Sequence, residues 1–174
     1  KHVKAFGHQG NAHLRGTKAD IWEGGHRVPL IAAWPAKIPA GSTSDALVEL
    51  TDLLATTAAI VGEPLSDAER SDSRNMLPAM LGEPTETPAR EFAVHHSLWG
   101  TFAIRRGPWT MIPARGSGGF TRPRTIEPSP GEPTGQLYHL ENDPSETVNL
   151  WKEHPEIVDE LRRLLASVQG REKQ

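Results

Sequence analysis

The chain has 174 residues, which is long enough for one domain, or for one domain plus a segment of another. Of these residues 36% are hydrophobic, enough to form a buried core. Its formal net charge of -3 excludes a global basic field that would draw it to nucleic acid or anionic lipid. The absence of cysteine excludes disulfides, thiolate metal sites and cysteine nucleophiles.

The first residues contain no apolar signal segment, and no stretch of about 18 apolar residues occurs anywhere in the chain. The sequence therefore encodes neither secretion nor a membrane helix. It begins with Lys1 and not with methionine, and we expect that the chain started upstream.

The N-terminal third predicts a loop, a strand and a helix in that order. Residues 1–26 are rich in glycine, histidine and charge and lack periodicity, as in a loop. Residues 28–34 form a short apolar run closed by prolines, which is typical of a strand buried on both faces of a parallel α/β sheet. Thr51 is a candidate N-cap for a helix, and Gly62 stands where such a helix would end.

The rest of the chain predicts a small antiparallel sheet covered by one helix. A proline-rich connector with a short helical turn at 76–81 precedes four apolar or alternating segments. From Pro155 onwards apolar residues recur at helical spacing, with acidic residues early and basic residues late. The expected strands are 92–96, 102–105, 109–112 and 136–140, and the long loop 116–135 precedes the last of them.

The terminal helix is expected to cover the sheet through one apolar seam. We predict that Ile157, Leu161, Leu164 and Leu165 pack on strands that include Ile104, Met111 and Leu137. Residues 1–62, by contrast, lack the neighbours that their strand needs. We expect them to be disordered, prone to aggregation or repaired by self-association.

Residues 8–27 hold the densest group of polar side chains, interleaved with glycines. Glycine lets backbone N–H groups approach an anion while lysine or arginine supplies charge, so this pattern is compatible with an anion-binding loop. A solvated surface loop is the alternative that composition alone favours. The spacings of His8, His13 and His26 match no paired zinc motif, and no calcium-loop or phosphate-loop motif occurs.

The segment 14–29, "LRGTKADIWEGGHRVP", resembles the block of type I, formylglycine-dependent sulfatases that runs into a buried strand and "WP". Three later blocks resemble the same family in the same order. They are "NMLPAML" at 75–81, "FAIRRGPW" at 102–109 and "QLYHLENDPSETVNL" at 136–150. The helix after the first strand, beginning "LTDL", is similar too, so the resemblance covers nearly the whole chain.

The resemblance implies an α/β, alkaline-phosphatase-like catalytic domain followed by a smaller α+β subdomain with an antiparallel sheet and one terminal helix. Residues 1–74 are then the C-terminal end of the catalytic domain, and 75–174 the subdomain. In the family the lysine of the "RGxK" block contacts the sulfate group, and here it is Lys18. His8 and His13 are candidates for binding the sulfate or a sugar. At the end of the strand 92–96, neighbouring residues face opposite sides, and we choose His96 over His95 for the site.

The family's formylglycine is made from cysteine or serine in "C/S-x-P-S/A-R", and that motif is absent here. The acidic calcium ligands of relatives lie upstream of residue 1. We therefore expect the isolated chain neither to bind calcium nor to turn over a sulfate ester without the missing N-terminal part of the catalytic domain. A fragment of a sulfatase and a natural truncation are both compatible with this pattern.

The choice of sulfate ester, aryl or carbohydrate, is not encoded in these motifs. The resemblance suggests a secreted or periplasmic parent protein. Two alternatives stay open: a non-catalytic binding or interaction module, and a piece of a phosphoesterase from the same superfamily.

Overall fold

The computed structural model describes residues 6–69, 72–84 and 86–171. The chain divides into two compact units, of which the first comprises Lys1–Val28 and Val94–Gln174 and the second Pro29–Ala93. The first unit is thus built from two distant parts of the sequence. The boundary predicted between residues 74 and 75 marks a family subdomain and stays a prediction.

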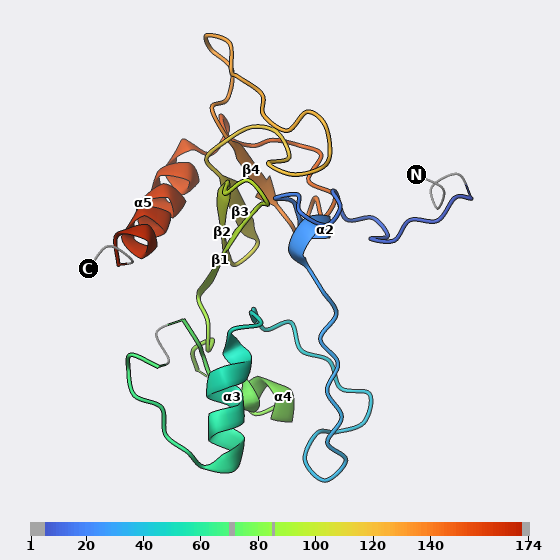
Figure 1. The fold of residues 1–174 in the computed structure, drawn as a ribbon, viewed down its shortest axis with the longest axis vertical. Helices are drawn as coiled ribbons and strands as arrows, with labels where there is room; N and C mark the ends of the chain where they lie inside the picture. Colours follow the sequence, from blue (N-terminus) through green and yellow to red (C-terminus); the bar gives the residue numbers. More distant parts are fainter. Residues whose placement is uncertain (1–5, 70–71, 85, 172–174) are drawn as a thin grey trace. The chain divides into compact units, whose positions relative to one another are not determined.

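A four-stranded sheet in the order β1-β2-β3-β4 forms the centre of the first unit (Figure 1). β2 pairs antiparallel with β3, and β3 with β4, so Ile104, Met111 and Leu137 are cross-strand neighbours on one face. Paired residues in an antiparallel sheet share a face because side chains alternate along each strand. The predicted strands are confirmed as β1 (Phe92–His96), β2 (Phe102–Arg106), β3 (Trp109–Ile112) and β4 (Gln136–His139).

The terminal helix α5 (Pro155–Arg171) covers the face that carries Ile104, Met111 and Leu137. It begins at Pro155, as predicted. The buried residues of the helix are Val158, Leu161 and Leu165, whereas Ile157 and Leu164 are only half-buried. The seam is therefore confirmed, but rotated so that Val158 and not Ile157 meets the sheet.

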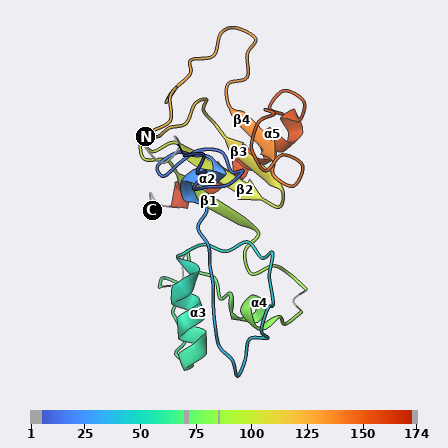
Figure 2. The ribbon, with the colours of Figure 1, turned by 90° about the vertical axis from the view of Figure 1, so that its right-hand side faces the viewer.

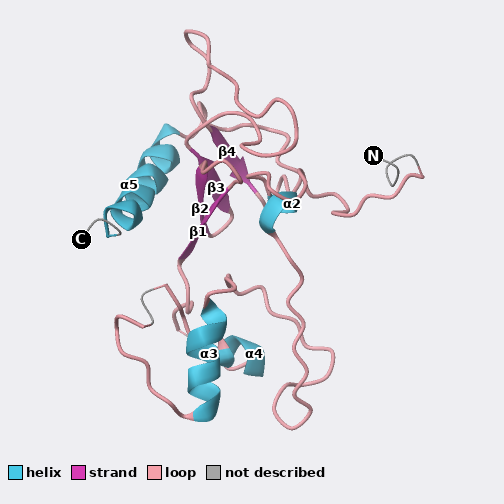
Figure 3. Ribbon diagram, viewed as in Figure 1, coloured by secondary structure: helices cyan, strands magenta, loops and turns pink. Residues whose placement is uncertain are grey.

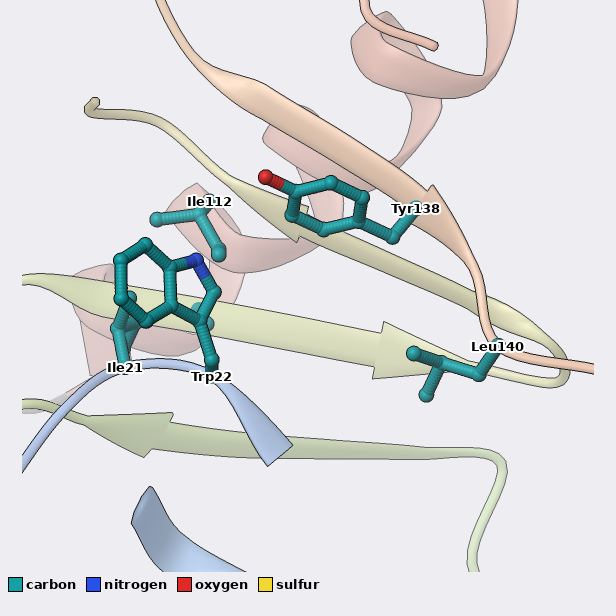
Figure 4. Packing of buried hydrophobic residues seen from close by; sticks show 6 residues of the cluster. Ile21, Trp22, Ile112, Tyr138 and Leu140 are labelled. Atoms are coloured by element: carbon teal, nitrogen blue, oxygen red, sulfur yellow. The ribbon is translucent and has the colours of Figure 1, made fainter. Parts of the chain in front are cut away.

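The opposite face of the sheet is covered by the N-terminal loop, which ends in the single-turn helix α2 (Glu23–His26). Ile21 and Trp22 pack on Ile112 and Tyr138 in one buried cluster (Figure 4). The expectation that all of residues 1–62 would be poorly packed is wrong for this segment: Ile21 is 0% and Trp22 3% exposed. The physical reason is that the loop uses the second face of the small sheet as its core partner.

The second unit contains α3 (Asp52–Val61) and α4 (Leu77–Leu81), which contact each other. Both helices were predicted, and Gly62 ends α3 in the left-handed conformation as expected. Thr51 is not a capping residue, because its side chain makes no cap hydrogen bond. Instead Asp52 accepts from the backbone of Glu49 and Arg74 and pairs with Arg90, so the buried side of α3 is polar.

Residues 28–34 do not form the predicted strand (Figure 3). Val28 is 57% and Ile31 90% exposed, and on α3 Leu54 and Val61 are also more than half exposed. A strand needs a hydrogen-bonded neighbour, and none of the described residues pairs with this segment. The apolar run is present in the sequence, but the residues that the structure describes do not form the sheet that it would join.

The loop between β3 and β4 extends beyond the end of the sheet (Figures 1 and 2). Part of it returns to the N-terminal loop, where the backbone N–H of Ile21 donates to the carbonyl of Ser117. Across the described parts of the chain, no helix combines the length and apolar character required to span a bilayer.

Candidate functional site

We call residues 14–26 the site loop, and Arg15 anchors it to the sheet. The Arg15 guanidinium donates to the Tyr138 hydroxyl at 3.0 Å and to the Glu146 carbonyl at 2.6 Å. It also lies over the Trp22 ring, 3.8 Å from the centroid. Hydrogen bonds and a cation–π contact together fix its position. The first and last resembling blocks of the sequence are therefore joined through one side chain.

A buried hydrogen-bond chain continues this anchor under the site loop. The Trp22 indole N–H and the Tyr138 hydroxyl both donate to Gln136 Oε1, at 3.0 Å and 2.8 Å. Gln136 in turn donates to the carbonyls of Ala114 and Gly116. Every member of this chain has a partner, which is the condition under which buried polar groups rigidify a structure.

Asp20 closes the tight turn that displays Lys18. Its carboxylate accepts hydrogen bonds from the backbone N–H of Thr17 at 2.8 Å and of Thr121 at 3.0 Å, and from the Thr121 hydroxyl. Burial alone would raise the pKa of Asp20, but these hydrogen bonds lower it below its ordinary value. A fixed anion therefore holds the base of the turn, while the Lys18 side chain is exposed at its tip.

Two glycines are required where the site loop closes on itself. A Cβ atom on Gly24 would lie 2.5 Å from the Arg15 carbonyl oxygen, and one on Gly25 would lie 2.0 Å from that of Asp20. Neither backbone atom can move without breaking the loop. The "GG" of the motif is thus explained by close backbone approach.

Glu23 forms ion pairs with two arginines and also lies near the ring of His26. Its carboxylate lies 3.3 Å from Arg27, 3.6 Å from Arg105 and 3.8 Å from the His26 ring. Glu23 and Arg27 are four residues apart, so the single turn of α2 brings them together. Because Glu23 is 2% exposed and surrounded by arginines, its role here is to hold the loop on strand β2.

His26 and His95 are half-buried and contact each other, with ring centroids 3.5 Å apart. His95 Nε2 also lies 3.1 Å from the carbonyl oxygen of Ile21. Burial is the main cause that lowers the pKa of both histidines to about 4, with Arg105 contributing for His26 and His26 itself for His95. Both rings are therefore neutral near pH 7. Sequence reasoning did not identify this pair, because a contact between residues 26 and 95 has no sequence signal.

Glu146 joins the last sequence block to the site loop. One of its oxygens accepts the backbone N–H of Glu23 at 2.8 Å, and the side chain is 0% exposed. Burial raises the pKa of Glu146 to about 8, with the charge of Glu23 adding to the rise. The carboxyl group is thus protonated in the folded protein near neutral pH.

We predict that the first unit is most stable near pH 6.5. Between pH 6.5 and about 4 the unfolded histidines bind protons that folded His26 and His95 do not, so acidification favours unfolding. Folded Glu146 keeps a proton up to about pH 8 whereas its unfolded form, with a pKa of 4.5, loses it, so stability also falls as pH rises from 6.5 to 8. The free energy of unfolding, from urea titrations, should fall by about 1–2 kcal/mol between pH 6.5 and about pH 5.

Glu146→Gln is the matched control for this pH profile, because the amide keeps the shape but cannot ionise. It should abolish the decline above pH 6.5 and steepen the acid-side decline, which Glu146 opposes in the parent chain. A stability that is constant or rises on acidification would contradict the neutral state of the two histidines in the folded protein.

The structure places the predicted site residues in different surroundings. Lys18 is exposed on the ordered turn described above, and His8 and His13 are exposed on the preceding loop. His96 is exposed, its Nδ1 lies 2.8 Å from the Ser97 carbonyl oxygen, and its ring is tilted against that of Phe102 with centroids 5.7 Å apart. It is His95, and not His96, that contacts the site loop directly.

The carboxylates near Lys18 do not fit a calcium ion. Asp20, Glu23 and Glu146 are all buried, and each is held by hydrogen bonds or ion pairs within the chain. Calcium takes six to eight oxygen ligands in an accessible cage, with about 2.3–2.6 Å to each. Within 6–69, 72–84 and 86–171 no group of three or more His, Asp or Glu side chains is arranged to hold a metal ion.

No protein-family profile matches the chain. Among curated proteins, it is 36% identical over 165 residues to an N-acetylgalactosamine-6-O-sulfatase of Bacteroides thetaiotaomicron, covering 95% of this chain and 32% of that protein. It is 29% identical over 178 residues to arylsulfatase G of Mus musculus, covering 92% of this chain and 31% of that protein. The chain thus spans about a third of the length of the curated relatives that it matches.

Solved structures agree with these relatives. One, from work on the metabolism of multiple glycosaminoglycans by Bacteroides thetaiotaomicron, is 35% identical with a TM-score of 0.80, covering 97% of this chain and 34% of that chain. A sulfatase of Pseudoalteromonas sp. has a TM-score of 0.72 at 21% identity, covering 91% of this chain and 32% of that one, which supports the fold alone. The fold described above recurs in both proteins.

Proposed function

Given that the chain belongs to the sulfatase family and corresponds to its C-terminal portion, we propose that it supplies the sulfate-contacting lysine and the C-terminal subdomain of an enzyme that hydrolyses sulfate esters. The observation that carries this proposal is the display of Lys18. The only lysine of the site loop is exposed at the tip of a turn whose base is fixed by Asp20, Thr17 and Thr121. A lysine carried on a fixed turn of this kind is suited to bind an oxyanion.

Lys18 would act on the charge that develops as the sulfate ester breaks. Its ammonium group donates to the nonbridging sulfate oxygens and stabilises negative charge in the transition state without reorganising the loop. Asp20 is the nearest anion in sequence, but its oxygens are occupied by the two threonines. The lysine charge is therefore left for the substrate.

His8, His13 and His96 are proposed as further substrate-binding residues. All three are exposed, and each imidazole can hydrogen-bond a sulfate oxygen or a sugar hydroxyl. His8 and His13 precede the site loop in sequence, whereas His96 ends strand β1, next to His95, which contacts that loop. Their support is accessibility and position, and each is tested separately from Lys18.

We place the nucleophile and the calcium ligands in the rest of the sulfatase. The 174 residues contain neither cysteine nor a serine in the formylglycine motif, and the carboxylates near Lys18 are occupied. In the complete enzyme, formylglycine would supply the nucleophile and calcium would supply charge at the sulfate. Residues 1–74 are proposed to complete the alkaline-phosphatase-like catalytic domain, and 75–174 to form the subdomain.

The exposed apolar residues of the second unit support a partner of this kind. They belong to the segment expected to be a buried strand and to one side of α3. Exposed large apolar groups in sequence proximity mark surfaces that are covered in the complete protein. The exposed residues are Leu30 and Ile31 of that segment, Leu50 just before α3, and Leu53, Leu54, Ile60 and Val61 on α3.

The isolated chain should release no product from a chromogenic aryl sulfate above the buffer rate, with or without added calcium. The physical reason is that a lysine stabilises the transition state but cannot replace the nucleophile. The complete sulfatase that carries this chain, assayed in parallel, should turn the same substrate over. Calcium-dependent turnover by the pure chain would contradict the placement of the nucleophile elsewhere.

A further inference from the structure

Two loops next to Lys18 are locked to the site loop by backbone contacts. The N–H of Leu98 donates to the Ala19 carbonyl at 3.0 Å, and the N–H of Trp99 donates to the Gly118 carbonyl at 3.3 Å. A Cβ atom on Gly119 would lie 2.3 Å from the same Ala19 oxygen. These contacts hold the loops 97–100 and 116–125 against the site loop, although neither loop contains a helix or a strand.

These two loops present an exposed aromatic pair. Trp99 is 53% and Phe120 56% exposed, and their rings meet edge to face with centroids 5.9 Å apart. Two other tryptophans of the same unit, Trp22 and Trp151, are only 3% and 9% exposed, so the exposure of Trp99 is unusual by comparison. The packing of the first unit does not require these two rings at its surface.

Arginine side chains accompany the aromatic pair. The Arg124 guanidinium lies 4.3 Å from the centroid of the Trp99 ring. Arg122, Pro123, Arg124 and Thr125 line an open hollow of about 570 Å³. Whereas Arg15, Arg90, Arg105, Arg106 and Arg115 have hydrogen-bonded or ionic partners, Arg122 and Arg124 have no carboxylate partner among the residues that the structure describes.

We propose that Trp99, Phe120 and Arg124, here called the aromatic platform, form a subsite for a sugar ring of an anionic oligosaccharide whose sulfate lies at Lys18. The C–H face of a pyranose is weakly positive and packs on the electron-rich face of an aromatic ring. A carboxylate or second sulfate on that sugar would pair with Arg124 and Arg122. This inference rests on the proposed function and specifies its substrate class.

The connection of the aromatic platform to the residue next to Lys18 favours a glycan over a small aryl sulfate as the ligand. Only Ala19 separates Lys18 from the buried Asp20, and Ala19 itself accepts the hydrogen bond from Leu98, the neighbour of Trp99. A small ester could contact Lys18 without reaching the two outer loops. A chain of sugars can contact both, so the platform would add affinity and selectivity rather than chemistry.

The test is equilibrium binding of a chondroitin-6-sulfate oligosaccharide to the isolated chain, measured by calorimetry. Trp99→Ala, Phe120→Ala and Arg124→Gln should each raise Kd by about tenfold or more. Phe6→Ala and Arg163→Gln are matched controls, since both residues are exposed and lie outside the two platform loops, and they should leave Kd within about twofold. Circular dichroism of each variant verifies that the fold is retained.

Two further measurements distinguish this inference from the proposed function. One uses the variant Lys18→Ala, and the other uses a probe from which the sulfate has been removed. Platform variants that bind less well while Lys18→Ala binds normally would support the platform and contradict the Lys18 assignment. Loss of binding only in Lys18→Ala would support the lysine and overturn the platform. Absence of binding by the parent chain, or equal binding of a neutral probe that is desulfated and carboxyl-reduced, would overturn the platform too.

Discussion

Replacing Lys18 by alanine in the complete sulfatase should lower kcat/KM for an aryl sulfate by about 100-fold or more. The basis is the loss of one preorganised donor to the sulfate oxygens, which costs about 2.7–4 kcal/mol of transition-state stabilisation in comparable sites. The turn itself should survive, because it is held by Asp20 and the backbone of Thr17 and Thr121 and not by the lysine side chain. Steady-state kinetics on the purified variant measures the effect.

Lys37→Ala is the matched control, because Lys37 is also an exposed lysine but lies outside the site loop. It should leave kcat/KM within about twofold, a difference of under 0.5 kcal/mol. If Lys18→Ala lost less than about threefold with an unchanged circular dichroism spectrum, Lys18 would belong to the solvated surface and not to the site. Lys18→Arg is informative as well, since it keeps the charge but alters the geometry of the donors.

Leu161→Asp should unfold or nearly unfold the first unit. Leu161 is 2% exposed and packs in the seam between α5 and the sheet, so the variant removes apolar burial and places an unpaired carboxylate there. We expect a loss of about 4 kcal/mol or more in the free energy of unfolding, a large part of the 5–15 kcal/mol typical of a domain. Urea unfolding followed by circular dichroism gives the value.

Arg163→Asp introduces the same side chain two positions further along the same helix. Arg163 is exposed, and its guanidinium hydrogen-bonds only the Asp159 carbonyl within α5. The loss should stay within about 1 kcal/mol, as for other surface substitutions. Equal losses in the two variants would show that α5 does not cover the sheet through Leu161, and that the destabilisation arises from charge on the helix alone.

The two predictions address separate contributions of the chain. Lys18 belongs to the site loop, which covers one face of the sheet, whereas Leu161 belongs to α5, which covers the other. A variant at Leu161 should therefore reduce activity only through loss of folded protein, and its remaining soluble fraction should keep the parent KM. A variant at Lys18 should leave the unfolding transition unchanged.

The helices and strands of the first unit could be predicted from residue patterns along short stretches of the sequence. Alternation and turn residues identified the four strands, and the spacing of apolar residues identified α5 and its partners Ile104, Met111 and Leu137. These signals are local because the period of side chains along a strand or helix is set by backbone geometry. The same reasoning missed that Val158 and not Ile157 is buried, because the rotation of a helix on a sheet depends on packing at both surfaces.

The sequence by itself determined the family resemblance, the candidate Lys18 and the absence of a formylglycine motif. Only the tertiary structure decided that the site loop covers the second face of the sheet, that Arg15 joins Tyr138 and Glu146, and that His26 meets His95. It also decided that residues 28–34 stay exposed. The reason is that periodicity reports which side of an element is apolar, whereas contacts between residues far apart in the chain depend on which partners are present to cover that side.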